Sequence, residues 1–194
     1  MTNSVAEGKP KAGKRERLVD AAVRVFHEQG VEKTTIADIA RVAEVPVGNV
    51  YYYFKTKDQL VEATIGAHGQ TLDRMIAELE QIDAPGERLK TLVRAWVEGR
   101  ERTVQFGCPT GTLVSELGKR ADGLDRQAAA SMRVLLDWVE RQFAAMGRAD
   151  ARESAVALVA AYQGISVLTN TFRDPELMVI EGERLERWID SLTD

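Results

Sequence analysis

The sequence predicts an all-α protein with a small N-terminal domain and a larger C-terminal helical domain. Apolar residues recur at the three- and four-residue spacing of amphipathic helices along most of the chain. Breaks containing Pro or Gly separate these segments, and neither a convincing strand pattern nor an internal repeat is visible. The composition, 44% hydrophobic and 29% charged, is that of a globular protein.

Charge divides the 194 residues into two parts. Residues 1–57 carry ten Lys and Arg against seven Asp and Glu, whereas residues 58–194 carry 16 against 23. The overall charge of −4 therefore combines a basic front with an acidic body. Such a division indicates two functions in one chain, the first of them compatible with binding nucleic acid.

The N-terminal region combines an arm and a helix. Residues 1–13 place Gly and Pro among lysines, so we expect a flexible basic arm. A helix is predicted from about Lys14 to Gln29, with Gly30 at its end. The arm lacks the apolar core of a signal peptide, and a single cysteine fits a reducing compartment. A cytoplasmic protein is therefore expected.

Two short helices follow. Thr35 is a suitable N-cap for a helix from Ile36 to about Ala43. Pro46 then disfavours helical geometry in the residue before it, which breaks the chain. A second short helix is predicted from about Val47 to Tyr53.

The remaining chain also reads as helices. Thr56 and Gln59 form a capping box that opens a long helix from Lys57 to about Gln81. Five further helices are expected, marked by Leu89–Val97, Pro109–Lys119, Met132–Met146, Asp150–Phe172 and the segment after Asp174-Pro175.

One apolar segment has the length of a membrane span. Ser154–Phe172 is 19 residues without a charge. Polar residues such as Tyr162, Gln163 and Asn170 interrupt it, so we expect a helix buried on nearly all sides in protein and no membrane partner.

A helix, a tight break and a second short helix form a helix-turn-helix, whose second helix enters the major groove of DNA. Here that helix reads "VGNVYYY". Val50, Tyr52 and Phe54 are expected to point inward. The residues expected to face DNA are Val47, Gly48, Asn49 and Tyr51, with the Tyr53 hydroxyl reaching a phosphate.

Helix N-termini attract phosphate through free N–H groups and the helix dipole. Thr34 and Thr35 stand at one such N-terminus and Lys57 at another, so these three residues are further candidates for DNA contact. Basic residues near the N-terminus could add phosphate contacts: Lys9, Lys11, Lys14, Arg15 and Arg17.

The segment "KTTIADIARVAEVPVGNVYYYFKTKDQL" closely resembles the DNA-binding segment of TetR-family transcriptional regulators. Glu44 departs from the pattern, because a glycine is common there, and it suggests a slightly different turn. The resemblance implies a helix-turn-helix domain over residues 14–57 and a ligand-binding and dimerisation domain over residues 58–194. It also implies a homodimeric repressor, less often an activator, that leaves a palindromic operator when a small molecule binds.

The body carries no recognisable catalytic set, so no enzyme is expected. His27 and His68 lack partners at metal-ligand spacing, and neither a metal nor a cofactor is expected. The segment "FGCPTGTLVSEL" resembles a Gly-Cys-x-x-Gly-x-Leu-x-x-Glu-Leu pattern in one branch of the TetR family, some of whose members sense electrophiles or oxidants. Cys108 is thus either a reactive sensor at a helix start or a small buried residue beside the pocket.

Large residues on the body helices are candidates for lining a ligand pocket, although each of them taken singly fits a core position better than a ligand contact. They are Trp96, Phe106, Cys108, Leu113, Leu117, Trp138 and Tyr162. A pocket lined by such residues favours an apolar or aromatic ligand.

The last two helices suit a homodimer, in which two copies would form a four-helix interface. The candidate interface residues are Ala157, Ala160, Ala161, Gly164, Leu185, Trp188 and Leu192. The alternative is that both helices close the core of one chain. A different class, a helical small-molecule carrier or interaction module without specific DNA binding, would share the pocket but not the "VGNVYYYFKTK" face.

Overall fold

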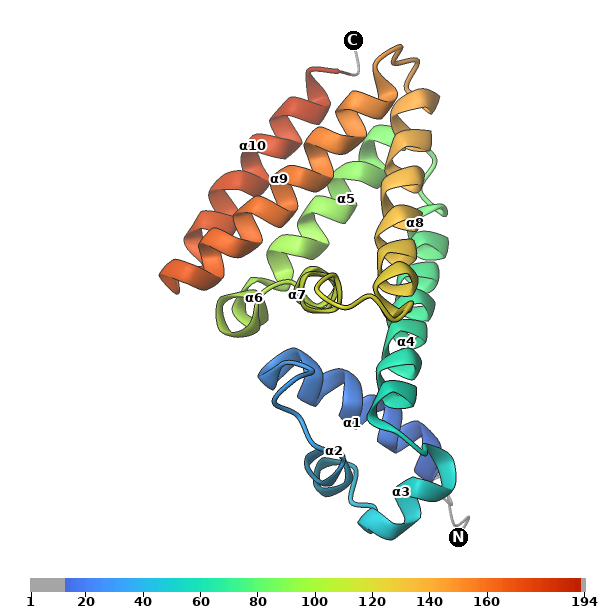
Figure 1. Cartoon of the computed structure of the whole chain (residues 1–194). Coiled ribbons are helices and arrows are strands. Elements are labelled where there is room, and N and C mark those ends of the chain that lie inside the picture. Colours follow the sequence, from blue (N-terminus) through green and yellow to red (C-terminus); the bar gives the residue numbers. More distant parts are fainter. Residues whose placement is uncertain (1–12, 193–194) are drawn as a thin grey trace, which may run out of the picture.

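The computed structural model describes residues 13–192, and within that range the chain forms ten helices and no strand (Figure 1). The helices are α1 (Lys14–Gln29), α2 (Ile36–Val42), α3 (Val47–Tyr53), α4 (Lys57–Leu79), α5 (Pro85–Glu98), α6 (Arg100–Phe106), α7 (Pro109–Leu117), α8 (Leu124–Ala145), α9 (Ala151–Phe172) and α10 (Glu176–Asp190). The all-α prediction is confirmed. Helix α6 was not predicted, and the basic arm, with Lys9 and Lys11, lies outside the described residues apart from Gly13.

Helices α1, α2 and α3 form the head, which lies below the other helices in Figure 1. Its core contains the apolar stripe of α1 and side chains from the two short helices, including Leu18, Val25, Ile39 and Val50. Thr35 caps α2 in a complete capping box with Asp38, so the helix starts where the sequence predicts.

The body has its own core, formed by α5, α8, α9 and α10 with the far end of α4 (Figure 1). Trp138 and Phe143 are fully buried at its centre. Burying two such large aromatic side chains contributes much of the hydrophobic stabilisation of a domain this size.

Helix α4 belongs to both parts and rises from the head along the body (Figure 1). Its first turns place Leu60, Val61 and Ile65 in the core of the head, and its last residue, Leu79, lies in the core of the body. The predicted division between residues 57 and 58 is therefore not a break in packing.

The turn between α2 and α3 keeps a left-handed backbone, because Glu44 has φ +53°. The expectation of a different turn at this position was therefore wrong. The Val45 N–H donates to the Ala40 carbonyl at 2.9 Å, and the Glu44 N–H donates to the Arg41 carbonyl at 3.2 Å. These bonds close the end of α2 and offset the strain of a left-handed residue that carries a side chain.

Helix α9 is buried on one side only, which corrects the expectation of nearly complete burial. It is long and apolar enough to span a membrane, with a mean hydropathy of 1.3 in its most apolar window, yet only 33% of that window is buried. Large apolar side chains stand out along it and on α10: Val156, Val167, Leu168, Phe172 and Ile180.

Candidate functional site

Helix α3 has an inward and an outward face. Val50 and, just beyond the helix, Phe54 are buried in the core of the head. The outward face carries Val47, Gly48, Asn49 and Tyr51, all of them exposed as expected. A methyl group added at Gly48 would meet no atom within 4 Å, so a flat partner can approach the backbone there.

The assignment of Tyr52 to the inward face was wrong, since 78% of this residue is exposed. Tyr53 turns towards the core instead, with its ring edge-to-face with that of Tyr52 at 4.9 Å. Helix geometry explains the exchange, because Tyr53 lies three residues after Val50 and therefore shares its side of the helix. The exposed Tyr52 enlarges the outward face.

The two threonines before α2 have different roles. Thr35 is exposed, and its hydroxyl is paired with the Asp38 carboxylate at 2.6 Å. Thr34 is 1% exposed, and its hydroxyl donates to the Gly30 carbonyl at 2.6 Å. The side chain of Thr34 therefore holds a turn and is not available to a phosphate, which corrects that prediction.

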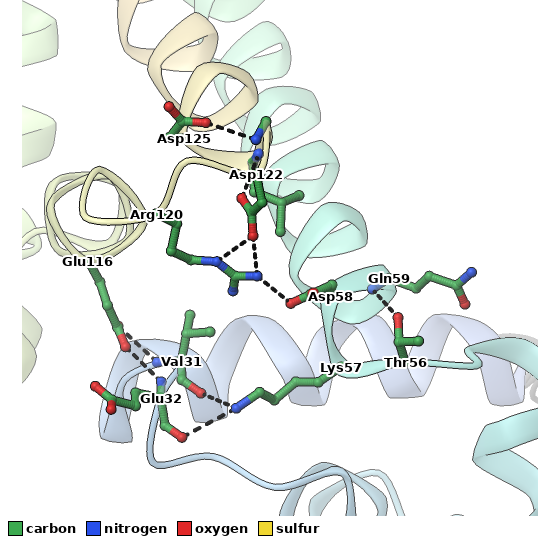
Figure 2. A network of polar contacts seen from close by, with 12 residues as sticks. Val31, Glu32, Thr56, Lys57, Asp58, Gln59, Glu116, Arg120, Asp122 and Asp125 are labelled. Carbon is green, nitrogen blue, oxygen red and sulfur yellow. Dashed lines mark hydrogen bonds and ion pairs between the residues drawn. The ribbon is translucent and has the colours of Figure 1, made fainter.

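Lys57 is likewise not a free phosphate ligand. Its ammonium group donates to the carbonyl oxygens of Val31 at 2.9 Å, Thr34 at 3.2 Å and Glu32 at 3.3 Å. Figure 2 shows the side chain reaching from the start of α4 towards the turn between α1 and α2. These carbonyl groups follow the end of α1, where partners within the helix are missing.

The same turn receives an anion from the other side (Figure 2). The carboxylate of Glu116, on α7, accepts the backbone N–H of Val31 at 2.8 Å and that of Glu32 at 2.7 Å. Arg120 adds a second contact at the junction between the body and the head, because its guanidinium donates to the Asp58 carboxylate on α4 at 2.8 Å. Sequence reasoning missed both residues, although Glu116 is the glutamate of the Gly-Cys pattern.

Three of the predicted ligand residues lie at the meeting point of α5, α7 and α9. Trp96 and Tyr162 stack with ring centroids 4.0 Å apart and planes inclined by 14°. The hollow beside them has a volume of about 10 Å³, room for about one water molecule. Burial raises the pKa of the Tyr162 phenol, and the neighbouring Cys108 thiol, to which it is hydrogen-bonded, raises it further.

The Cys108 sulfur is buried at the start of α7. It accepts the backbone N–H of Gly111 at 3.3 Å, and the side-chain amide of Gln163 lies 3.7 Å away. The thiol thus acts as the N-cap of α7, which explains the helix start at this position.

The other four ligand candidates are elsewhere. Phe106 packs edge-on against His27 at the junction, and Leu113 and Leu117 enter the core of the head. Trp138 is fully buried in the body, with its indole N–H donating to the Glu80 carboxylate at 3.2 Å. The seven candidates therefore do not form a single site.

A much larger hollow, of about 1260 Å³, is an open groove between α1 and α4. Seven of its 16 lining residues are charged: Arg15, Glu16, Asp20, Arg24, Asp73, Arg74 and Arg102. Its size does not make it the apolar pocket that the sequence predicts, because apolar ligands bind in enclosed, mostly apolar cavities.

The predicted dimer residues fall into two groups. Ala157, Ala160 and Gly164 are exposed on the outer face of α9, and Ala161 is partly buried. The stripe of α10, formed by Leu185, Trp188 and Leu192, instead packs into the core of its own chain. That part of the prediction was wrong, because the partner of the stripe lies within the body and not in a second copy.

Comparisons with known proteins agree with this geometry. Residues 18–64 match the family model described as bacterial regulatory proteins, tetR family. The chain is 26% identical over 188 residues to the transcriptional regulator TtgR of Pseudomonas putida, covering 91% of this chain and 88% of the relative. It is 32% identical over 136 residues to the regulator BetI of Cronobacter sakazakii, covering 68% and 62%.

Solved structures show the same fold. A TetR-family transcriptional regulator from Streptomyces coelicolor superposes with a TM-score of 0.81 at 24% identity, covering 93% of this chain and 96% of that one. A head with an outward recognition helix on a helical body defines the class of helix-turn-helix transcriptional regulators, which bind DNA and are not enzymes. Within that class, the chain belongs to the TetR family, whose members are typically ligand-responsive repressors.

The histidines at the junction give the fold a dependence on pH. Burial lowers the pKa of His27, whose ring nitrogen Nε2 lies 2.9 Å from the Gly107 carbonyl, and burial also lowers that of His68. The unfolded chain therefore binds more protons than the folded chain as pH falls through about 6.5, and stability falls with it.

We expect His27→Gln, which keeps a donor for the Gly107 carbonyl, to reduce this dependence on pH. Urea unfolding of both proteins at pH 7.5 and pH 5.5 measures it. The wild type should lose more free energy of unfolding between the two pH values than the variant does. Equal losses would contradict the assignment.

Proposed function

We propose that this regulator is a repressor that binds a palindromic operator as a homodimer and leaves it when a small molecule binds. The outward face of α3 carries the proposal, because the burial of Val50 fixes which side is presented. Asn49 can pair with base edges and Val47 can contact a thymine methyl group. In this proposal the Tyr51 hydroxyl contacts the DNA backbone, as does that of Tyr53, whose ring is only partly buried, and the start of α2 at Thr35 offers N–H groups to a phosphate.

The exposed apolar face of α9 supports the homodimer. Ala157, Ala160 and Gly164 are small enough for two helices to approach closely, and Val156 and Val167 flank them. A two-fold axis beside α9 brings the same face of each copy together. The two heads would then read major grooves about 34–36 Å apart, which a palindromic operator presents.

The stacked pair Trp96 and Tyr162 supports an aromatic or otherwise apolar inducer. A drug-sized ligand needs roughly 300–1,000 Å³, whereas the hollow here has a volume of about 10 Å³. The helices around it must therefore separate on binding. A ligand that binds only the opened conformer shifts the population towards it, and the operator is released if that conformer misplaces the heads. We propose that this activity is cytoplasmic, in line with the expectation from the single cysteine.

A second candidate, thiol sensing of an electrophile or oxidant, is favoured by the surroundings of Cys108. The backbone N–H of Gly111 and the side-chain amide of Gln163 both contact its sulfur, so the thiol is held in one position at the start of α7. Its burial, however, requires a reagent to enter the body first.

The DNA-binding face is tested by replacing its amide and phenol. We expect Asn49→Ala and Tyr51→Ala each to weaken binding to DNA from immediately upstream of the protein's own gene by about 10- to 100-fold, because each removes a groove or backbone contact. Fluorescence anisotropy against this duplex, a scrambled duplex and a salt series measures the change. Gln127→Ala, an amide truncation on the exposed surface of α8, is the matched control and should bind like the wild type. Unchanged affinity in the Asn49 and Tyr51 variants would contradict the proposal. If the wild type itself prefers neither duplex, selection from a random-sequence library shows whether the protein binds a specific operator elsewhere or binds no specific DNA.

The dimer is tested with a charge on α9. Val167 is 63% exposed, and we expect Val167→Glu to separate the dimer, because an interface would bury the unpaired carboxylate. Sedimentation velocity measures the mass. Val134→Glu makes the same change at an exposed valine of α8 and should leave the dimer intact. Two variants with the mass of the wild type would exclude α9 from the interface.

Thiol sensing is tested with N-ethylmaleimide as the probe. If Cys108 is a sensor, alkylation releases the wild type from DNA, while Cys108→Ser binds DNA equally well and ignores the reagent. Mass spectrometry records whether the thiol was modified. Full DNA binding by an alkylated wild type would exclude the sensor.

A further inference from the structure

The turn between α1 and α2, residues 30–33, is held between two opposite charges (Figure 2). On one side, the N–H groups of Val31 and Glu32 donate to the Glu116 carboxylate at 2.8 and 2.7 Å. On the other side, the carbonyl groups of the same two residues accept from the Lys57 ammonium at 2.9 and 3.3 Å. Hydrogen bonds to ions are about twice as strong as those between neutral groups, so both contacts restrain the turn.

The backbone is shaped for this contact. Gly30 has φ +83°, and a Cβ atom there would lie 3.3 Å from one carboxylate oxygen of Glu116 and 3.5 Å from the other. Any larger residue would therefore be strained and would press against the carboxylate. A second contact from the body, between His27 and the Gly107 carbonyl, holds the end of α1 beside it.

The held turn sets where the DNA-reading helices begin. Thr34 follows directly and is tied back to Gly30, and Thr35 then caps α2. Helix α2 leads through the tight turn at Glu44 into α3. A shift of the turn relative to the body therefore shifts the start of α2, and with it the recognition helix α3.

Glu116 lies at one end of α7, and the other end of that helix touches the proposed ligand site. A Cβ atom on Gly111 would lie 2.3 Å from the side-chain oxygen of Gln163, a residue of α9, and 3.4 Å from the Cys108 sulfur. Helix α7 has only nine residues, so movement at its start is carried to its end with little bending.

We propose that Glu116 is a positioning residue for DNA recognition, through which α7 transmits changes at the Cys108 and Gln163 end to the head. This rests on the proposed function. Lys57 fixes the turn to α4, which itself carries the head, whereas Glu116 fixes it to α7, which packs on α8 of the body as well as on the head. Of the two charges, Glu116 is therefore the one whose displacement moves the head relative to the body.

The first test is Glu116→Gln, which keeps the size of the side chain but presents an amide N–H₂ to one of the two N–H groups. We expect about tenfold weaker operator binding by fluorescence anisotropy, the factor for one lost charge-assisted bond. Glu98→Gln, the same change on the exposed surface of α5, should leave binding unchanged. Hydrogen exchange should speed up at the amides of Val31 and Glu32 in the Glu116 variant while the melting temperature changes little. Operator binding equal to that of the Glu98 variant overturns the proposal.

The second test separates transmission from a merely structural role. Gly111→Leu places a bulky side chain at the start of α7, against Gln163 of α9. If this variant does not fold, Gly111→Ala, which adds one methyl group, replaces it. The substitution at Gly111 should weaken operator binding in the wild type and have little further effect in the Glu116→Gln background. Independent effects of the two substitutions, which multiply in the double variant, overturn transmission through Glu116.

Failure of the proposed function has a different signature. A wild type that prefers no duplex, even after selection from a random library, fails as an operator-binding repressor. The hydrogen-exchange rates at Val31 and Glu32 still report the contact of their N–H groups with the Glu116 carboxylate in that case, since the measurement requires no DNA. Unprotected amides at both residues in the wild type show that this contact does not form and overturn the proposal.

Discussion

The structure depends on a single helix being part of two cores. Helix α4 contributes Leu60 and Val61 to the head and Leu79 to the body, so neither core is complete without it. Its far end is fixed: the Arg88 guanidinium donates to the Ile82 carbonyl at 2.6 Å, and Trp138 holds the Glu80 carboxylate. A displacement inside the body can therefore tilt α4 about this fixed end, and its largest effect falls on the head.

That arrangement connects the head to the body in several ways. The backbone of α4 is continuous, Leu113 and Leu117 of α7 pack into the core of the head, and Glu116 and Arg120 add polar contacts (Figure 2). The covalent connection transmits any tilt, whereas a tilt that separates the donors from the acceptors breaks the polar contacts. A ligand can favour one conformer over another only if it binds the two with different affinity.

Local patterns were enough to predict most of the helices and the position of the recognition helix. Helix starts at Thr35, Thr56 and Pro109 follow from caps and proline placement, which act within a few residues. The errors arose where the local pattern admits two answers. Tyr52 and Tyr53 are adjacent rings, and the one that turns inward is Tyr53, which shares the side of the buried Val50.

The candidate site was predictable only where a face is defined by its own helix. The exposure of Asn49 and Tyr51 follows from the burial of Val50, but the internal bonds of Thr34 and Lys57 do not. Contacts such as that of Glu116 with Val31, 85 residues apart, depend on how the body docks on the head. The stripe of α10 shows the same limit, because the sequence reveals an apolar face without revealing whether its partner lies in the same chain.

The closed stack of Trp96 on Tyr162 has a consequence for the speed of a response. With space for little more than one water molecule beside the rings, a ligand cannot enter until thermal motion parts the surrounding helices. At high ligand concentrations, entry then proceeds at the rate of this opening, and adding more ligand no longer accelerates it. In the proposed function, the protein, and not the supply of the compound, sets the shortest delay between exposure and release.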